Sequence, residues 1–144
     1  LVVNGDIFCD WDVARAANAL RPGDLAHLVL VPNPPHHPHG DFCLQVGRVD
    51  AECAPRAAAD AQVLTFSGIG IYRPQVFAGI QRGQKAKLAP LLRTAMAQNQ
   101  VSGELHAGCW IDVGTPQRLD ELDRQIRSRS HEGTQSPMQG HRDI

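Results

Sequence analysis

The chain has 144 residues, of which 42% are hydrophobic and 20% are charged. This apolar fraction is typical of a folded domain rather than a disordered chain, and no run reaches the roughly 20 apolar residues that a transmembrane helix needs. The 14 Lys and Arg residues against 15 Asp and Glu residues give a formal net charge of −1. The composition therefore predicts one globular domain without the basic surface that binds nucleic acid or an anionic membrane.

Strand-like and helix-like patterns alternate along the first half of the chain. Residues 1–3 form an apolar run that ends at the turn signal Asn4-Gly5-Asp6, which predicts a buried strand. The same reasoning predicts a helix over 12–20, a buried strand over 25–31, a loop over 32–40 and a hairpin over 42–49.

The second half continues this alternation. The patterns predict a strand over 63–72, a short helix over 74–80, an amphipathic helix over 88–96, strands over 101–106 and 109–113, and a final helix capped by Thr115. After Arg127 the composition turns to Ser, Gln, Gly, His and Arg, so we predict a domain over residues 1–127 and a disordered tail over residues 128–144. Strands that alternate with helices favour an α/β fold.

The four cysteines lie far apart and form no Cys-x-x-Cys pair; they are Cys9, Cys43, Cys53 and Cys109. Because nothing indicates a secreted, disulfide-stabilised chain, we expect reduced, mostly buried thiols in a cytoplasmic protein. His36, His37 and His39 lie just before Cys43, which makes zinc binding an alternative. The intervening prolines and the spacing match no common zinc module, so a solvent-exposed turn is favoured.

Two aspartates stand at predicted strand ends. Asp6 follows the first strand, and Asp112 lies in a strand that ends at Gly114. Ligands of open α/β sheets bind beyond the carboxyl ends of strands, and Mg²⁺ prefers one or two carboxylates together with phosphate oxygens. A turn explains Asp6 alone and a helix cap explains Asp112 alone, but the pair predicts a metal site.

A third acidic motif is Asp10-Trp11-Asp12. Metal-dependent glycosyltransferases use an Asp-x-Asp pattern to bind nucleotide-sugar diphosphates, which gives an alternative function. Both aspartates also stand where a helix should begin, and capping explains them more simply.

Glycines and lysines supply candidate substrate contacts. Ser67-Gly68 lies within a predicted strand, where a glycine lets a sugar ring approach the backbone, and Gly40 closes the histidine loop. Lys87, like Lys85, precedes the amphipathic helix and can neutralise a phosphate. A β-bulge and a solvated surface are the respective structural alternatives.

Five segments carry a family resemblance. They are Leu-Val-Val-Asn-Gly-Asp (1–6), Gly-Asp-Phe (40–42), Leu-Thr-Phe-Ser-Gly-Ile-Gly-Ile-Tyr (64–72), Lys-Leu-Ala-Pro-Leu-Leu-Arg (87–93) and Trp-Ile-Asp-Val-Gly-Thr (110–115). In this order, over residues 1 to about 123, they resemble the sugar-1-phosphate nucleotidyltransferases. The resemblance implies an α/β fold with a Rossmann-like, GT-A-like mixed sheet flanked by helices. It also implies that a sugar 1-phosphate attacks the α-phosphate of a nucleoside triphosphate and releases pyrophosphate.

The resemblance implies roles for individual residues. Asp6 and Asp112 match the family's magnesium-binding aspartates. The residues that match or adjoin sugar-phosphate contacts are Asn4, Gly40, Ser67, Gly68 and Lys87, and no catalytic residue is assigned beyond the metal ligands. The implied substrates are UTP and N-acetylmuramate 1-phosphate, with mannose and glucose phosphates as alternatives. This places the expected activity in nucleotide-sugar biosynthesis and peptidoglycan recycling.

The chain also departs from the family pattern. The family's glycine-rich loop, Leu-Ala-Ala-Gly-x-Gly-x-Arg followed by Pro-Lys, cradles the triphosphate and does not occur in this sequence. We therefore expect the chain to represent the C-terminal part of such an enzyme, with the N-terminal half missing, and to be inactive alone. The alternatives are a glycosyltransferase that uses Asp10 and Asp12, and a non-catalytic module that only binds a sugar phosphate. The sequence predicts no oligomeric state.

Overall fold

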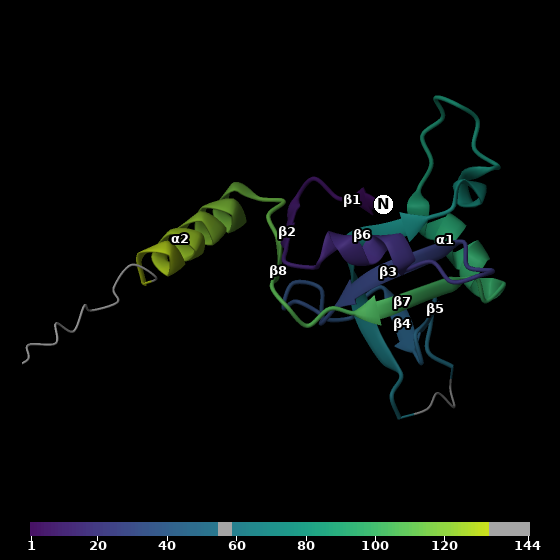
Figure 1. The fold of residues 1–144 in the computed structure, drawn as a ribbon, viewed down its shortest axis with the longest axis horizontal. Coiled ribbons are helices and arrows are strands. Elements are labelled where there is room, and N and C mark those ends of the chain that lie inside the picture. Colours follow the sequence, from purple (N-terminus) through teal and green to yellow (C-terminus); the bar gives the residue numbers. More distant parts are fainter. Residues whose placement is uncertain (55–58, 133–144) are drawn as a thin grey trace, which may run out of the picture.

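Figure 1 shows the computed structural model of the chain, in which residues 1–54 and 59–132 are described. The strands are β1 (Val2–Val3), β2 (Ile7–Cys9), β3 (Ala26–Val31), β4 (Phe42–Gln45), β5 (Arg48–Asp50), β6 (Gln62–Tyr72), β7 (Val101–Leu105) and β8 (Trp110–Asp112). The helices are α1 (Leu88–Ala97), α2 (Pro116–Glu132) and the short 3₁₀ helices η1 (Val13–Asn18) and η2 (Pro74–Phe77).

One mixed sheet, in the order β1-β6-β3-β7-β5-β4, curls until β4 also pairs with the start of β6. β3 and β7 are parallel and the other pairs are antiparallel. Strands β6, β3, β7, β5 and β4 therefore close into a small barrel, while β2 and β8 form a separate two-stranded ribbon. The predicted mixed α/β fold is confirmed. The predicted Rossmann-like sheet does not describe this part of the chain, because its strands close into a ring.

The hairpin of β4 and β5 causes this closure. Val46 and Gly47 form its turn with φ angles of 48° and 72°, and a two-residue turn with both φ angles positive matches the twist of antiparallel strands. The short hairpin presents β4 to β6, with Phe42 opposite Leu64, and presents β5 to β7. The sheet edge that an open fold would leave free is thereby paired.

The core forms on both faces of β3, every residue of which is buried. Side chains of neighbouring residues in a strand point to opposite faces. Leu28 and Leu30 accordingly pack in one cluster with Leu92 of α1, whereas Val29 packs in another cluster with Trp11. The strand predicted over 25–31 and the amphipathic helix predicted over 88–96 are both confirmed.

A disulfide joins Cys43 to Cys53, so the prediction of reduced thiols is wrong for this pair. Cys43 lies opposite Asp50 in the β4–β5 hairpin, and the chain needs only a short further path to bring Cys53 beside it. A sequence separation of 10 residues does not reveal this proximity until the hairpin is known. Cys9 and Cys109 are free thiols.

The two ends of the described chain differ from the sequence expectation. β1 was expected to be buried, yet Leu1, Val2 and Val3 are 56%, 51% and 48% exposed, because β1 pairs with the edge of β6 without a covering layer. α2 runs to Glu132 and extends away from the barrel (Figure 1). Residues 128–132, expected to begin a disordered tail, are therefore helical, and 133–144 lie outside the described residues. Within the described ranges, no helix combines the length and the apolarity that crossing a membrane requires.

A buried ion pair ties the hairpin to the start of β3. Asp24 is 3% exposed, and its carboxylate accepts a hydrogen bond from Arg48 at 2.7 Å. Burial raises the pKa of Asp24, but hydrogen bonds from Ser102 and Arg48 outweigh this effect and hold its pKa below the ordinary value. The carboxylate is therefore charged at neutral pH and compensated by Arg48, as a buried charge requires.

Candidate functional site

β6 changes partners along one of its edges. Its start pairs with β4 and its end pairs with β1, and residues 65–68 between them lie opposite neither strand. Other groups bind the backbone there: the Phe66 N–H donates to the Asp41 carboxylate at 2.8 Å, and the Gly68 carbonyl accepts from the Asn4 N–H at 2.9 Å. This interrupted stretch of β6 leaves room for a ligand between two strands.

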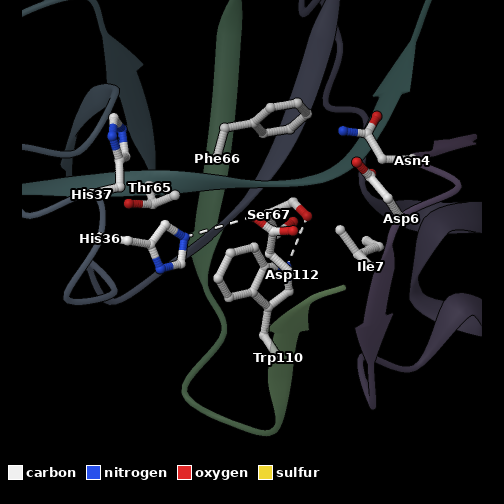
Figure 2. A pocket seen from close by; sticks show the side chains of 10 residues that line it. All are labelled: Asn4, Asp6, Ile7, His36, His37, Thr65, Phe66, Ser67, Trp110 and Asp112. Atoms are coloured by element: carbon white, nitrogen blue, oxygen red, sulfur yellow. Dashed lines mark hydrogen bonds and ion pairs between the residues drawn. The ribbon is translucent and has the colours of Figure 1, made fainter. Parts of the chain in front are cut away.

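A cavity of about 320 Å³ opens at this stretch. Figure 2 shows the side chains around it, which come from four separate segments of the chain. The lining residues are Asn4, Asp6, Ile7, His36, His37, Thr65, Phe66, Ser67, Trp110 and Asp112. Most of them are polar, and both aspartates predicted to bind a metal are among them.

The β2–β8 ribbon brings Asp6 and Asp112 together. Ile7 lies opposite Asp112, and the Val113 N–H donates to the Asp6 carbonyl at 2.8 Å. Both carboxylates face Gly114: a Cβ added there would lie 3.0 Å from Asp112 Oδ1 and 3.4 Å from Asp6 Oδ2. The two carboxylates therefore converge beside a residue that has no side chain.

Three groups orient the Asp112 carboxylate. The Gly114 N–H donates to Oδ1 at 2.7 Å and Arg118 donates to Oδ2 at 2.8 Å, while His36 Nε2 lies 3.6 Å from Oδ2. The Gly114 hydrogen bond lowers the pKa of Asp112, and the charges of Arg118 and His36 add to this effect against the opposing influence of burial. Asp112 is consequently held as a charged, fixed acceptor.

The donor set fits a hard divalent cation. A carboxylate has about four lone-pair sites, and Gly114 and Arg118 occupy two of those on Asp112, so the remaining ones are available to a ligand. Two carboxylates with room for phosphate oxygens between them are typical of Mg²⁺ sites. Asp6 and Asp112 are therefore the residues of this cavity that can hold such an ion.

Ser67 lies in the cavity wall, but its hydroxyl is already used. It donates to the Val29 carbonyl at 2.7 Å and accepts the Ile69 N–H at 3.1 Å, which bridges β3 and β6 where their register shifts. The Ser67 carbonyl accepts the indole N–H of Trp110 at 2.8 Å (Figure 2). These bonds make Ser67 part of the framework of the cavity, and they use the one O–H donor of its hydroxyl.

Gly68 fixes the position of Asn4. Its φ is +88°, and a Cβ added there would lie 2.8 Å from Asn4 Nδ2. Only glycine combines this left-handed backbone with so close a neighbour. The predicted close approach at Gly68 is thus made by Asn4, which in turn faces the cavity.

Three predicted substrate contacts, Gly40, Gly68 and Lys87, are not among the residues that line this cavity. Gly40 turns the chain beside β6, where an added Cβ would lie 2.9 Å from the Leu64 carbonyl. Lys87 is the residue before α1, and the next residue, Leu88, lines a second cavity of about 310 Å³ together with Asn4. Lys87 therefore lies close to the site but not in its wall.

The histidine loop, predicted to be a solvent-exposed turn, contributes to the cavity. The loop is partly exposed, yet His36 and His37 both line the wall (Figure 2), and His37 Nε2 lies 3.1 Å from Asp41 Oδ1. The concentration of histidines before Asp41 was the available signal. His37 faces Asp41, four residues further along the chain, whereas His36 faces Asp112, which is distant in the sequence.

Asp10 and Asp12 face different partners. Asp12 caps η1 by accepting the Ala14 N–H at 3.0 Å, which confirms the predicted capping role. Asp10 pairs with His106 Nε2 at 2.7 Å, and the Cys109 backbone and His106 lower its pKa. Neither residue lines the cavity with Asp6 and Asp112, so their positions give no support to the glycosyltransferase alternative.

The mixed α/β fold is similar to that of a solved structure. A protein from Bacillus anthracis, described as a glucose-1-phosphate thymidylyltransferase and crystallised with sucrose, superposes with a TM-score of 0.60 and 17% identity, over 87% of this chain and 53% of that one. At this identity the match establishes the fold alone. No family model matches the chain.

By sequence, the chain is similar to a sugar-1-phosphate nucleotidyltransferase, which confirms the resemblance of its motifs. It is 52% identical over 124 residues to the N-acetylmuramate alpha-1-phosphate uridylyltransferase of Neisseria meningitidis serogroup B. The match includes 84% of this chain and 52% of the relative. The chain therefore spans about half the length of the curated relative that it matches.

Proposed function

We propose that the chain forms the metal-binding and sugar-phosphate-binding part of a sugar-1-phosphate nucleotidyltransferase. In the complete reaction, an oxygen of the sugar 1-phosphate attacks the α-phosphate of a nucleoside triphosphate, the nucleotidyl group is transferred and pyrophosphate leaves. The observation that carries this proposal is the convergence of Asn4, Asp6 and Asp112 on one polar cavity beside the interrupted edge of β6. The 52% identity to a uridylyltransferase makes UTP and N-acetylmuramate 1-phosphate the proposed substrates.

Asp6 and Asp112 are the proposed ligands of Mg²⁺. When bound, such an ion neutralises phosphate charge and orients the reacting oxygens. The contribution of the chain is to fix these two carboxylates. Arg118 and Gly114 hold the Asp112 carboxylate through hydrogen bonds, so that its geometry is set before any ligand arrives.

The remaining polar groups of the cavity are proposed to bind the sugar phosphate. Asn4 presents a side-chain amide that can donate to a phosphate or accept from a sugar hydroxyl. His36 and His37 stand across the cavity from Asn4 (Figure 2) and offer ring N–H groups. Ser67 shapes the wall through its backbone, Gly68 positions Asn4, and Lys87 lies near enough to the second cavity to attract an anion.

A cytoplasmic location stays a prediction. The disulfide between Cys43 and Cys53 is the observation that argues against it, because the cytosol keeps most protein thiols reduced. Counting the thiols of protein isolated under alkylating conditions from the host cell would test the prediction. Four alkylated cysteines are expected in a reducing compartment, and two indicate the disulfide.

Calorimetric titration of the chain with N-acetylmuramate 1-phosphate tests the proposed site. Binding is expected only when Mg²⁺ is present, and Asp6→Asn or Asp112→Asn should weaken it about tenfold or more, because each removes one of two carboxylate ligands. The matched control is Asp12→Asn, since asparagine caps a helix as well as aspartate does. Equal affinity in the wild type and all three variants would contradict the proposal. Metal-dependent binding of a nucleotide sugar that is lost in Asp12→Asn and retained in Asp112→Asn would favour the glycosyltransferase alternative.

Mixed with UTP, Mg²⁺ and N-acetylmuramate 1-phosphate, the 144 residues are expected to release no pyrophosphate. The reason is that the glycine-rich segment which binds the triphosphate in this family does not occur among them. Pyrophosphate release that is abolished by Asp112→Asn would show instead that the chain is active alone.

A further inference from the structure

A second group of metal-binding side chains lies at the other end of the β2–β8 ribbon. Cys9 Sγ, a carboxylate oxygen of Asp10 and a ring nitrogen of His106 all lie within 4.8 Å of one another. Asp6 and Asp112 stand at the opposite end of the same strands, about three residues away, which corresponds to roughly 10 Å along a strand. The two groups are therefore separate sites on one ribbon.

The backbone holds each of the three residues in place. Cys9 is the last residue of β2 and lies opposite Trp110 of β8. The Asp10 N–H donates to the Cys109 carbonyl at 3.1 Å, and the His106 N–H donates to the Leu30 carbonyl at 2.7 Å at the end of β3. The cluster thus joins the ribbon to the barrel.

Gly108 leaves the space in which the cluster lies. A Cβ added to Gly108 would stand 2.5 Å from Asp10 Oδ1 and 2.6 Å from the His106 ring. Asp10 and His106 consequently meet directly above a residue without a side chain. Their hydrogen bond of 2.7 Å shows that the two ligand atoms already face each other.

The chemistry of the cluster is that of zinc. Thiolate, imidazole and carboxylate are the three side-chain ligands of Zn²⁺, at about 2.0–2.3 Å, and a hard cation such as Mg²⁺ does not favour sulfur. Binding of a divalent cation would displace the Cys9 thiol proton, and the cation would then balance the two negative charges of the thiolate and Asp10. The cluster reaches solvent through Asp10, whose side chain is 54% exposed, whereas that of His106 is 13% exposed.

We propose that Cys9, Asp10 and His106 bind a zinc ion, with water as the fourth ligand. The ion would replace the direct Asp10–His106 hydrogen bond and connect β2 to the segment between β7 and β8. Two-stranded ribbons are at best marginally stable alone, so this connection holds the ribbon that carries Asp6 and Asp112. The proposal rests on the geometry of the cluster and does not depend on the proposed function.

Metal titration of the metal-free chain tests this site. The chain is prepared anaerobically with the Cys43–Cys53 disulfide intact, and a thiol count should find Cys9 and Cys109 free. Zn²⁺, measured by competition with a chromogenic chelator, is expected to bind with a stoichiometry of one. Co²⁺ in its place should give the near-ultraviolet absorption of a thiolate–cobalt bond.

The variants identify the ligands. Cys9→Ser should abolish the thiolate–cobalt absorption, and Cys9→Ser and His106→Gln should each weaken Zn²⁺ binding more than about tenfold, the lower range for loss of a supporting residue around a metal. Cys109→Ser is the matched control and should retain both signals. If Cys9→Ser does not fold, His106→Gln measures the same site.

Three results would overturn the proposal. The first is a thiol count of zero, which would mean that Cys9 and Cys109 form a disulfide. The second is an unchanged Co²⁺ spectrum in Cys9→Ser, and the third is loss of stoichiometric Zn²⁺ in Asp112→Asn but not in His106→Gln. The last result would place the ion at the other end of the ribbon.

Discussion

Replacing Gly68 with alanine tests how β6 and β1 frame the cavity. Gly68 has a φ of +88°, and an added Cβ would lie 2.8 Å from Asn4 Nδ2 and 2.9 Å from Asn4 Cβ. A left-handed backbone costs an L-residue about 1–2 kcal/mol. Displacing Asn4 also breaks its backbone hydrogen bond to Gly68, a loss of about 0.5–1.5 kcal/mol. We therefore expect the free energy of unfolding to fall by about 1.5–3.5 kcal/mol.

Urea denaturation followed by tryptophan fluorescence measures this change. The matched control is Gly79→Ala, because a Cβ added to Gly79 meets nothing within 4 Å, and its effect should stay within about 0.5 kcal/mol. A second variant, Asn4→Gly, separates the two causes. In that background Gly68→Ala keeps the backbone cost and loses the contact, so the two substitutions should show a coupling energy of about 0.5 kcal/mol or more.

Two outcomes would refute the reasoning about Gly68. If Gly68→Ala is as stable as Gly79→Ala, then β6 does not hold this residue in a left-handed conformation. If the coupling energy with Asn4→Gly is zero, then the two residues are not in contact. If Gly68→Ala lowers the stability without such a coupling, the whole effect comes from the cost of the left-handed backbone at residue 68.

Three further predictions concern the framework of the domain. Cys43→Ser should lower the free energy of unfolding by about 2–3 kcal/mol, the chain-entropy value for the loop closed with Cys53; equal urea midpoints with and without reductant would contradict it. Asp24→Asn removes the partner of Arg48. Because the pKa of Asp24 lies below its ordinary value of 3.8, its stabilising effect is complete above that pH and is lost as the pH falls further. The stability difference between wild type and Asp24→Asn should therefore shrink on acidification, and a growing difference would be evidence against the ion pair. Leu92 is 1% exposed, so Leu92→Ala should cost about 2–5 kcal/mol in thermal unfolding, and a loss below 1 kcal/mol would indicate a loosely packed core.

Local patterns in the sequence predicted the elements that local forces determine. The apolar run over 25–31 forms β3, which is fully buried. A strand that is buried on both faces is apolar throughout and shows no alternation of apolar and polar residues. The spacing of leucines over 88–96 became α1, and Asp12 caps η1 as expected. In each case the residues that decide the structure lie within a few positions of one another.

Closure of the barrel depends on pairings between distant segments and could not be predicted in this way. β5 reaches β7 through a pairing of Arg48 with Ser102, which no local pattern specifies. The β4–β5 hairpin that closes the barrel also brings Cys43 near Cys53, whereas Val2 is exposed because β1 pairs with the edge of β6. The site also combines locally predictable residues with residues placed by distant contacts. Asp6 was predicted from its place at a strand end, whereas His36 joins the cavity only because its loop folds back over β8.

The register of the β2–β8 ribbon decides whether the two aspartates meet. Ile7 lies opposite Asp112, and because neighbouring residues of a strand face opposite sides, a slip of one position would turn the Asp112 side chain away from the cavity. A ribbon of two strands does not fix its own register strongly. The backbone bond from Val113 to Asp6, at 2.8 Å, anchors one end.

The other end of the ribbon is anchored by the bond from the Asp10 N–H to the Cys109 carbonyl, at 3.1 Å. This bond lies within the cluster to which we assign zinc, and His106 attaches that cluster to the end of β3. A disturbance at this end is therefore free to shift the register along the short strands and to move Asp112. On this proposal the magnesium ligands would depend on residues at the far end of the ribbon, and Asp10 would act on the site through β2.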